Sequence, residues 1–179
     1  MREMKQILVT DRLILREFTT SDASFIFELL NSEDWLRYIG DRNIKTISDA
    51  ENYLTEGPIK SYKLRGFGLY AVCLKETGLP IGMCGLLKRE FLDYPDVGFA
   101  FLPRFFGNGY GSEMVTATLK WGFNTLAIDK IQAIVAPGNQ VSIALLHKLG
   151  FAYEKKVQMP EGDEILILYT LTRDDLLIS

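Results

Sequence analysis

The chain has little cysteine and only one histidine among its 179 residues. Both cysteines, Cys73 and Cys84, lie in apolar runs that suit strands, so we expect small buried side chains in a reducing compartment rather than a disulfide or a metal pair. Burial disfavours the thiolate, which argues against a cysteine-based acyl-enzyme. His147 falls off the neighbouring apolar stripe and is expected to face solvent, so a Ser-His-Asp triad has no support. No spacing of ligands predicts a metal site.

A long apolar run and a strong charge of either sign are also missing. No run approaches the roughly 18 residues that span a bilayer, and the start "MREMKQILVTDRLILREF" lacks the apolar core of a signal peptide. We therefore expect a cytoplasmic protein without a membrane partner. A net charge of −3 gives no support to nucleic-acid binding. With 47% hydrophobic and 24% charged residues and no repeat or linker, residues 1–179 are predicted to form a single globular domain.

The order of the apolar patterns predicts a mixed α/β domain, β-α-α-β-β-β-α-β-α-β-β. Capping residues at 20–22 precede the first helix, and a second helix is expected to start at Ser48 and stop near Gly57-Pro58. Two stretches, 31–43 and 88–96, show no regular pattern and are expected to hold the residues that select the substrate. The predicted strands span 12–18, 67–74, 80–87, 96–103, 130–136, 152–159 and 164–171, and the later helices span 112–126 and 139–150.

Three glycines at alternate positions, Gly107, Gly109 and Gly111, precede the helix at 112–126. Unpaired amides at a helix N-terminus bind anions, and glycines without β-carbons would let a pyrophosphate approach the backbone. An ordinary turn would need one glycine rather than three. The spacing fits neither the P-loop, because Ser112-Glu113 follows the last glycine, nor the dinucleotide fingerprint, because G-x-G-x-G replaces G-x-G-x-x-G.

The segment "PRFFGNGYGSEM" fits the R/Q-x-x-G-x-G/A signature of the GNAT superfamily of acyl-CoA-dependent N-acetyltransferases. The later segment "NQVSIALLHKLGF" is similar to a second motif of that family. The opening "TDRLILREFTTSDASFIFELL" resembles the branch that contains the ribosomal-protein N-terminal (alanine) acetyltransferases. The three motifs occur in order and with suitable spacing over nearly the whole chain.

The resemblance implies the GNAT fold, in which helices flank a mixed, mostly antiparallel twisted sheet. CoA would lie in a V-shaped gap between two splayed central strands, here the strand ending at Leu102 and the strand 130–135. Strand backbone would bind the pantetheine arm, the loop amides would bind the pyrophosphate, and Asn139 would reach the arm from the other side. The residues implied to bind the cosubstrate acetyl-CoA are Ala100, Phe101, Leu102, Arg104, Gly107, Asn108, Gly109, Tyr110, Gly111, Ser112 and Asn139.

Acetyl transfer to an amine needs a base near the amine and a donor to the developing oxyanion. In the family, a carboxylate at the start of the strand before the glycine loop often serves as base, usually through water, and Asp96 holds that position. The alternative for Asp96 is a solvated residue in the turn "LDYPD". A strand amide near Ala100 is the expected oxyanion donor. The further acidic candidates are Glu90 and Asp93 for the base and Glu33 and Asp34 for the amine pocket.

The departing thiolate also needs a proton, and here the sequence departs from the family. Many GNAT enzymes present a tyrosine four residues before the glycine of the last helix, and Leu146 stands at that position. Ser142, one turn earlier on the same face, is the candidate for protonating the sulfur, directly or through water. A role for Ser142 in helix packing is the alternative.

The resemblance therefore implies transfer of acetyl from acetyl-CoA to a primary amine, either a protein N-terminal α-amine or a small molecule. Direct attack in a ternary complex is expected, with no metal and no covalent intermediate. The alternative is a CoA- or acyl-CoA-binding sensor that acetylates no amine, which Leu146 suggests. Related enzymes are often monomers or dimers, so a monomer or homodimer is expected.

Overall fold

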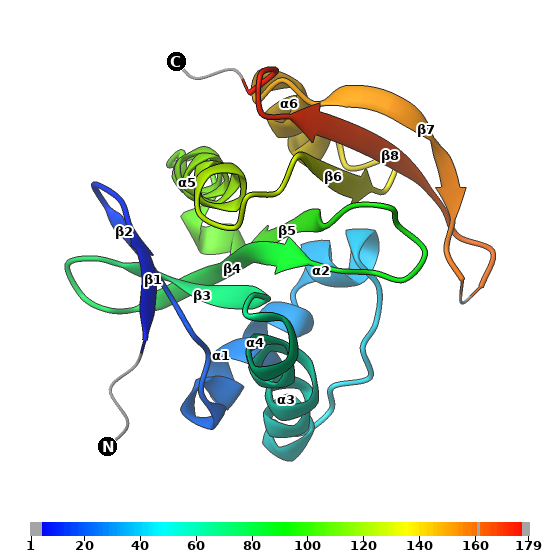
Figure 1. Cartoon of the computed structure of the whole chain (residues 1–179). Helices are drawn as coiled ribbons and strands as arrows, with labels where there is room; N and C mark the ends of the chain where they lie inside the picture. The colour runs from blue at the N-terminus through cyan, green and yellow to red at the C-terminus, as the bar shows by residue number, and fades with distance from the viewer. Residues whose placement is uncertain (1–4, 161, 177–179) are drawn as a thin grey trace.

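In the computed structural model, which describes residues 5–160 and 162–176, the strands form one open sheet (Figure 1). Its order is β1-β2-β3-β4-β5-β6-β8-β7, and each neighbouring pair is antiparallel except β5 with β6. The strands are β1 Gln6–Val9, β2 Leu13–Arg16, β3 Leu69–Leu74, β4 Pro80–Leu87, β5 Asp96–Phe101, β6 Lys130–Val135, β7 Ala152–Gln158 and β8 Ile165–Thr172.

Helices cover both faces of this sheet. The alternation of β3 shows how, because Tyr70 and Val72 pack into a core with α5 and α6, whereas Ala71 and Cys73 pack into a second core with α1 and α3. These two helical layers lie on opposite sides of the sheet in Figure 1. The helices are α1 Ala23–Leu30, α2 Glu33–Tyr38, α3 Ile47–Leu54, α4 Lys60–Arg65, α5 Tyr110–Asn124 and α6 Gln140–Lys148, with 3₁₀ turns at Thr20–Asp22 and Pro103–Phe105.

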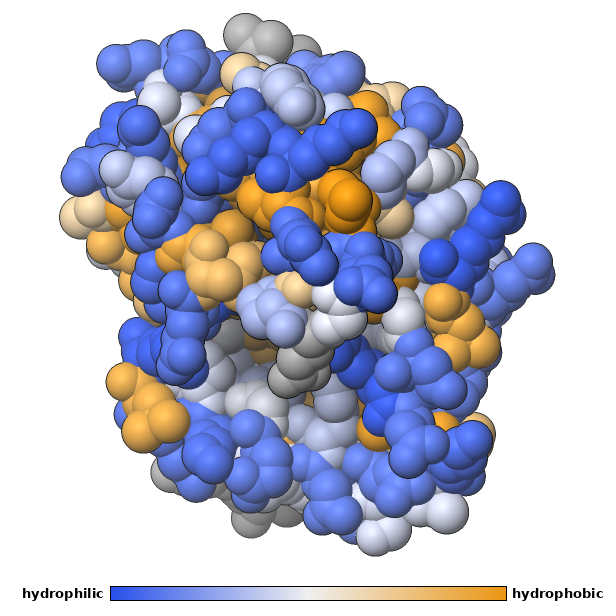
Figure 2. Space-filling model, turned by 90° about the vertical axis from the view of Figure 1, so that its right-hand side faces the viewer, coloured by the Kyte–Doolittle hydropathy of each residue, from blue (hydrophilic) through white to orange (hydrophobic). Residues whose placement is uncertain are grey.

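Both cysteines lie in these cores, as the sequence predicts. Each is free, and burial raises the pKa of the Cys84 thiol to about 12. On the face shown in Figure 2, hydrophilic side chains predominate and apolar ones form separate patches. Among the helices of the described residues, none is long and apolar enough to span a membrane.

The N-terminal half differs from the predictions in three places. The strand expected at 12–18 is present as β2, but the sequence did not predict β1, which pairs with β2 across a turn at residues 10–12. The helix expected to stop near Gly57-Pro58 continues to Arg65, because a π-helical turn at Thr55–Ile59 accommodates the proline, which has no N–H to donate. The stretch 31–43, expected to be irregular, contains α2.

The two central strands, β5 and β6, pair at one point and then separate. Their only ladder position within the described chain is Asp96 with Gln132, beside a bond from the Gln132 amide to the Pro95 carbonyl oxygen (2.8 Å). The buried Gln132 side chain reinforces this junction, because its oxygen accepts a bond from the Tyr94 amide (3.2 Å). Beyond it, the strands leave a gap at the centre of the sheet, as the resemblance implies.

Candidate active site

The glycine loop between β5 and α5 exposes a row of unpaired amides. The first internal bond of α5 runs from the Glu113 amide to the Gly109 carbonyl oxygen (3.0 Å), so the amides of residues 110–112 have no acceptor within the helix. Gly107 and Gly109 both have φ of +77°, whereas Gly111 lies in the first turn of α5 without a positive φ. A β-carbon at Gly107 would meet no atom within 4 Å. The loop is therefore open to a ligand and rich in free donors.

The β1–β2 turn holds this loop from behind. The Glu113 carboxylate accepts bonds from the Thr10 hydroxyl (2.6 Å) and from Arg12 Nε (2.7 Å). Arg12 also donates to the Asn108 carbonyl oxygen (2.9 Å) and lies over the Tyr110 ring, 4.7 Å from its centre. Burial alone would raise the pKa of Glu113, but these hydrogen bonds outweigh it and leave that pKa below its usual value. Glu113 thus stays ionised and joins two distant segments.

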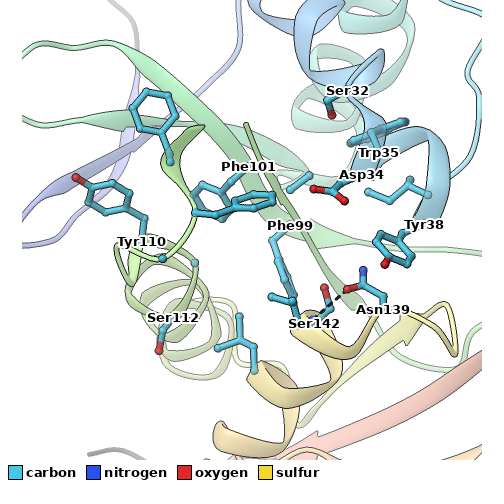
Figure 3. A pocket seen from close by; sticks show the side chains of 18 of the residues that line it. Ser32, Asp34, Trp35, Tyr38, Phe99, Phe101, Tyr110, Ser112, Asn139 and Ser142 are labelled. Carbon is cyan, nitrogen blue, oxygen red and sulfur yellow. Dashed lines mark hydrogen bonds between the residues drawn. The ribbon is translucent and has the colours of Figure 1, made fainter. Parts of the chain in front are cut away.

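A cavity of about 450 Å³ extends from the loop along β5 to α2 and α6, and we name it the loop-side cavity (Figure 3). Its walls are mostly aromatic and aliphatic. The residues that line it are Ser32, Asp34, Trp35, Tyr38, Ile39, Phe99, Ala100, Phe101, Phe105, Phe106, Gly107, Gly109, Tyr110, Gly111, Ser112, Asn139, Val141, Ser142 and Leu145.

A second cavity, of about 480 Å³, contains Asp96 and shares part of its lining with the first; we name it the Asp96-side cavity. Its lining includes the polar residues Arg42, Tyr53, Arg89 and Glu164. We name the lining residues that both cavities share the junction. The junction residues are Trp35, Tyr38, Ile39, Phe99, Asn139 and Ser142.

Asp96 is a buried carboxylate, with 1% of its surface exposed. The prediction of a solvated turn residue is therefore wrong, because β5 begins at Asp96 and carries its side chain inwards. Both oxygens accept a bond from Arg89 Nε, at 3.1 and 3.0 Å. Burial raises the pKa of Asp96 above its ordinary value, and the charge of Arg89 only partly offsets this effect. Asp96 is therefore a buried carboxylate, held by an arginine, at the floor of the gap between β5 and β6.

The edge of β5 that faces the gap offers a second set of donors. The Leu102 amide bonds to the Ile81 carbonyl oxygen of β4 (2.9 Å), and the Pro95 carbonyl oxygen bonds to β6. Because β5 pairs with β4 without a bulge, alternation points the amides of Phe99 and Phe101 into the gap and that of Ala100 towards β4. The Leu102 amide is therefore paired within the sheet, and the same alternation turns the Ala100 amide, expected near the oxyanion, towards β4. The amides on this edge that face the gap are those of Phe99 and Phe101.

A family model described as "Acetyltransferase (GNAT) domain" matches residues 12–152. The chain belongs to the GNAT acetyltransferase family. It is 32% identical to an uncharacterised N-acetyltransferase, YoaA, from Bacillus subtilis, over 84% of this chain and 85% of the relative.

Solved structures agree on the fold. A ribosomal-protein-S5-alanine acetyltransferase from Vibrio fischeri superposes with a TM-score of 0.75 at 20% identity, covering 97% of this chain and 100% of that one. The structure of an aminoglycoside acetyltransferase, AAC(6')-Ib, in complex with coenzyme A superposes with a TM-score of 0.73 at 23% identity. The match covers 91% of this chain and 96% of that one. GNAT enzymes transfer acetyl from acetyl-CoA, so the chain is an acetyltransferase with acetyl-CoA as its donor.

Helix α6 brings three predicted positions of the GNAT site together. Asn139 caps the helix, because its side-chain oxygen accepts a bond from the Ser142 amide (3.2 Å, dashed in Figure 3), and both side chains face the two cavities. Leu146 is buried and lines the Asp96-side cavity, so an apolar side chain replaces the usual tyrosine there. His147 is exposed, as predicted, and Gly150 ends the helix with φ of +96°.

Several predicted residues lie outside the cavities. Arg104 forms an ion pair with Glu28 instead of reaching the loop. The side-chain amide of Asn108 donates to the carbonyl oxygens of Phe105 and Phe106, both at 3.1 Å. Asp34 does line a cavity, but it is the loop-side cavity rather than the one that contains Asp96. Neither cavity is lined by Glu33, Glu90 or Asp93. No three metal-binding side chains cluster in residues 5–160 and 162–176.

The sequence missed Arg89, Trp35 and Tyr38. Arg89 lies in the irregular stretch 88–96, and the other two lie on α2, which joins no motif. The one available signal was their place in the two stretches predicted to select the substrate. The structure shows that those stretches do line the Asp96-side cavity.

Proposed function

We propose that this protein transfers acetyl from acetyl-CoA to a primary amine by direct attack in a ternary complex. The observation that carries the proposal is the pair of cavities that meet at the junction. One has free loop amides at its outer end, and the other contains a buried carboxylate. A donor entering from the loop and an acceptor entering from the Asp96 side would meet at β5.

In this proposal the donor occupies the loop-side cavity. The amides of residues 107–112 bind the pyrophosphate, helped by the positive end of the α5 dipole. The backbone of β5 at Phe99 and Phe101 binds the pantetheine arm and thioester as an added strand would, and Asn139 reaches the arm from α6. The Phe99 or Phe101 amide then meets the oxyanion as the carbonyl becomes tetrahedral.

Asp96 acts as the base, directly or through one water. The incoming ammonium is attracted to the carboxylate and gives up a proton there, and its nitrogen lone pair then attacks the thioester carbonyl carbon. The raised pKa of Asp96 makes it a better proton acceptor than an exposed aspartate. Arg89 holds both carboxylate oxygens and fixes their direction.

The acceptor cavity suits an amine attached to an apolar or aromatic body. Trp35, Tyr38 and Tyr53 contribute rings, and Met159 and Leu166 contribute flexible or aliphatic surface. The ribosomal-protein and aminoglycoside enzymes of similar fold are named for a protein and a sugar acceptor, so both classes belong in the test.

The test is thiol release from acetyl-CoA with four acceptors: an alanyl tripeptide, spermidine, kanamycin and phenethylamine. We expect amine-dependent release with at least one of them and an acetylated amine in the mass spectrum. Tight CoA binding in calorimetry without amine-dependent release would instead support the sensor, the alternative that Leu146 suggests. A protein that neither binds CoA nor releases thiol would contradict both.

A further inference from the structure

The thioester sulfur needs a proton donor at the junction, because acetyl-CoA enters through one cavity and the amine through the other. The position from which many GNAT enzymes supply this proton is Leu146, which has none to give. Leu146 also lines only the Asp96-side cavity and is 1% exposed. The donor must therefore come from another residue of the junction.

Two of the six junction side chains carry a hydroxyl, Tyr38 and Ser142. Trp35 is committed elsewhere, since its ring N–H donates to the Gly40 carbonyl oxygen (3.0 Å). Asn139 is a neutral amide and a poor acid. Ile39 and Phe99 have no exchangeable side-chain proton. The choice lies between the two hydroxyls.

We propose that Tyr38, the last residue of α2, protonates the departing CoA thiolate, an inference that rests on the proposed acetyl transfer. A phenol is a much stronger acid than an aliphatic hydroxyl, so it is the better donor to a thiolate leaving group. Figure 3 shows Tyr38 reaching from α2 towards Asn139, on the opposite wall from Ser142. Its hydroxyl has no hydrogen-bond partner in the part of the chain that the structure describes.

The Tyr38 ring lies against its neighbour Arg37 and opposite Gly138, while its hydroxyl is unpaired among the described residues. The Arg37 guanidinium lies over the ring, 5.1 Å from its centre. Gly138, in the loop just before α6, lies beside the ring, because a β-carbon built on it would be 3.9 Å from the ring edge. A half-buried phenol with an unpaired O–H that lines both cavities can meet a sulfur atom that arrives at the junction.

Asp96 first passes to solvent the proton that it took from the ammonium. The neutral amine nitrogen then forms the C–N bond and loses its second proton to Asp96 or its water. The tetrahedral intermediate collapses, the C–S bond breaks, and its electron pair goes to sulfur. The Tyr38 O–H proton passes to the sulfur to give CoA thiol, and the phenolate regains a proton from solvent after the products leave. No oxidant, reductant or metal is required.

Tyr38→Phe tests this role, because it keeps the ring and removes the proton. We expect kcat to fall by about 100-fold, the lower range for losing a general acid, while CoA affinity in calorimetry and the melting temperature stay unchanged. Hydrolysis of acetyl-CoA without an amine should fall in parallel, because the same thiolate leaves. Tyr153→Phe is the matched control, since Tyr153 lies on β7, is 60% exposed and lines neither cavity.

A Tyr38→Phe protein with unchanged kcat in both reactions would overturn the proposal. The proposal would also be overturned if Ser142→Ala, and not Tyr38→Phe, lowered kcat in both reactions, because the proton would then come from Ser142. The hydrolysis assay separates this proposal from the proposed function. A wild type that hydrolyses acetyl-CoA but acetylates no amine would contradict amine transfer, while the effect of Tyr38→Phe on hydrolysis would still decide the role of Tyr38.

Discussion

Gly109 and Gly111 are two residues apart, yet glycine has a different effect at each position. Gly109 has φ of +77°, a conformation that costs other residues about 1–2 kcal/mol, and its β-carbon would lie 3.5 Å from the Arg12 guanidinium. Gly111 has no positive φ, and its β-carbon would make ordinary contacts with Phe101 (3.7 Å) and Leu145 (3.8 Å). Both neighbours line the loop-side cavity, so Gly111 keeps that cavity open.

Substitution by valine should separate these roles. Gly111→Val should weaken CoA binding by about tenfold, roughly 1.4 kcal/mol, and leave the melting temperature nearly unchanged. Gly109→Val should lower both the CoA affinity and the melting temperature, because a valine there adds backbone strain at a positive φ to the loss of space for the ligand. Calorimetry with CoA and thermal unfolding of each variant measure the two effects. If both variants bound CoA as tightly as the wild type, the phosphate role of the loop would be wrong.

Asp96 should appear in the pH dependence of turnover. The base works only when ionised, so activity should fall as pH drops through its pKa. Because burial raises that pKa, the acid limb should lie above the ordinary aspartate value of about 3.9. Asp96→Asn should remove the limb and lower kcat at neutral pH, with less loss at high pH, where more of the amine is already neutral. Superimposable pH profiles of wild type and variant on phenethylamine would exclude Asp96 from the mechanism.

Arg89 provides an independent test of the same assignment. Its charge lowers the pKa of Asp96, so Arg89→Gln should raise that pKa and move the acid limb to higher pH. The profile of kcat against pH measures the shift, and a melting curve checks that the buried carboxylate has not unfolded the domain. An unmoved limb would mean that another group than Asp96 titrates there.

At the scale of elements, the pattern of the chain predicted most of the second half of the fold. Strands β4 and β6 and helix α6 lie close to their predicted bounds, because each combines strong periodicity with a clear stop. The six-residue α2 was missed, since one buried residue, Trp35, gives no stripe. The glycine loop was predictable because its residues are adjacent in sequence. The sequence could not predict that Tyr38, Arg89 and Asp96 line one cavity, because three separate segments of the chain carry them.

The turn between β1 and β2 and the loop before α5 also form a unit that the sequence does not reveal. We expect Glu113→Gln and Arg12→Ala each to raise the KM for acetyl-CoA by about three- to tenfold with little change in kcat, because the Asn108 backbone loses its support. Initial-rate measurements and the double variant test this, and the two effects should not add. The exposed Lys60–Glu56 pair is the control, and Lys60→Ala should change neither constant.

An effect confined to Arg12→Ala would contradict that positioning role. It would indicate that the guanidinium acts on the ligand by its charge, since Glu113→Gln leaves the arginine in place and frees it from its partner.

For the whole molecule, the arrangement of layers explains why one sheet can present two substrates to each other. Helices α5 and α6 cover the face that carries the glycine loop, and helices α1, α2 and α3 cover the other face. The single ladder position between β5 and β6 lets the sheet open at its centre. Both cavities are lined from both layers, and α2, α6 and the residues that flank them supply most of the lining that the two cavities share.

This geometry predicts a ternary complex rather than an acetylated enzyme. Initial rates with both substrates varied should give intersecting reciprocal plots, and the protein should retain no acetyl group after incubation with acetyl-CoA alone. CoA joined through an acetyl bridge to phenethylamine would fill both cavities and should bind about 100-fold more tightly than CoA, because the second contact becomes intramolecular. Parallel plots with an acetylated protein in the mass spectrum, or a conjugate that binds no better than CoA, would show that the two cavities are not filled together.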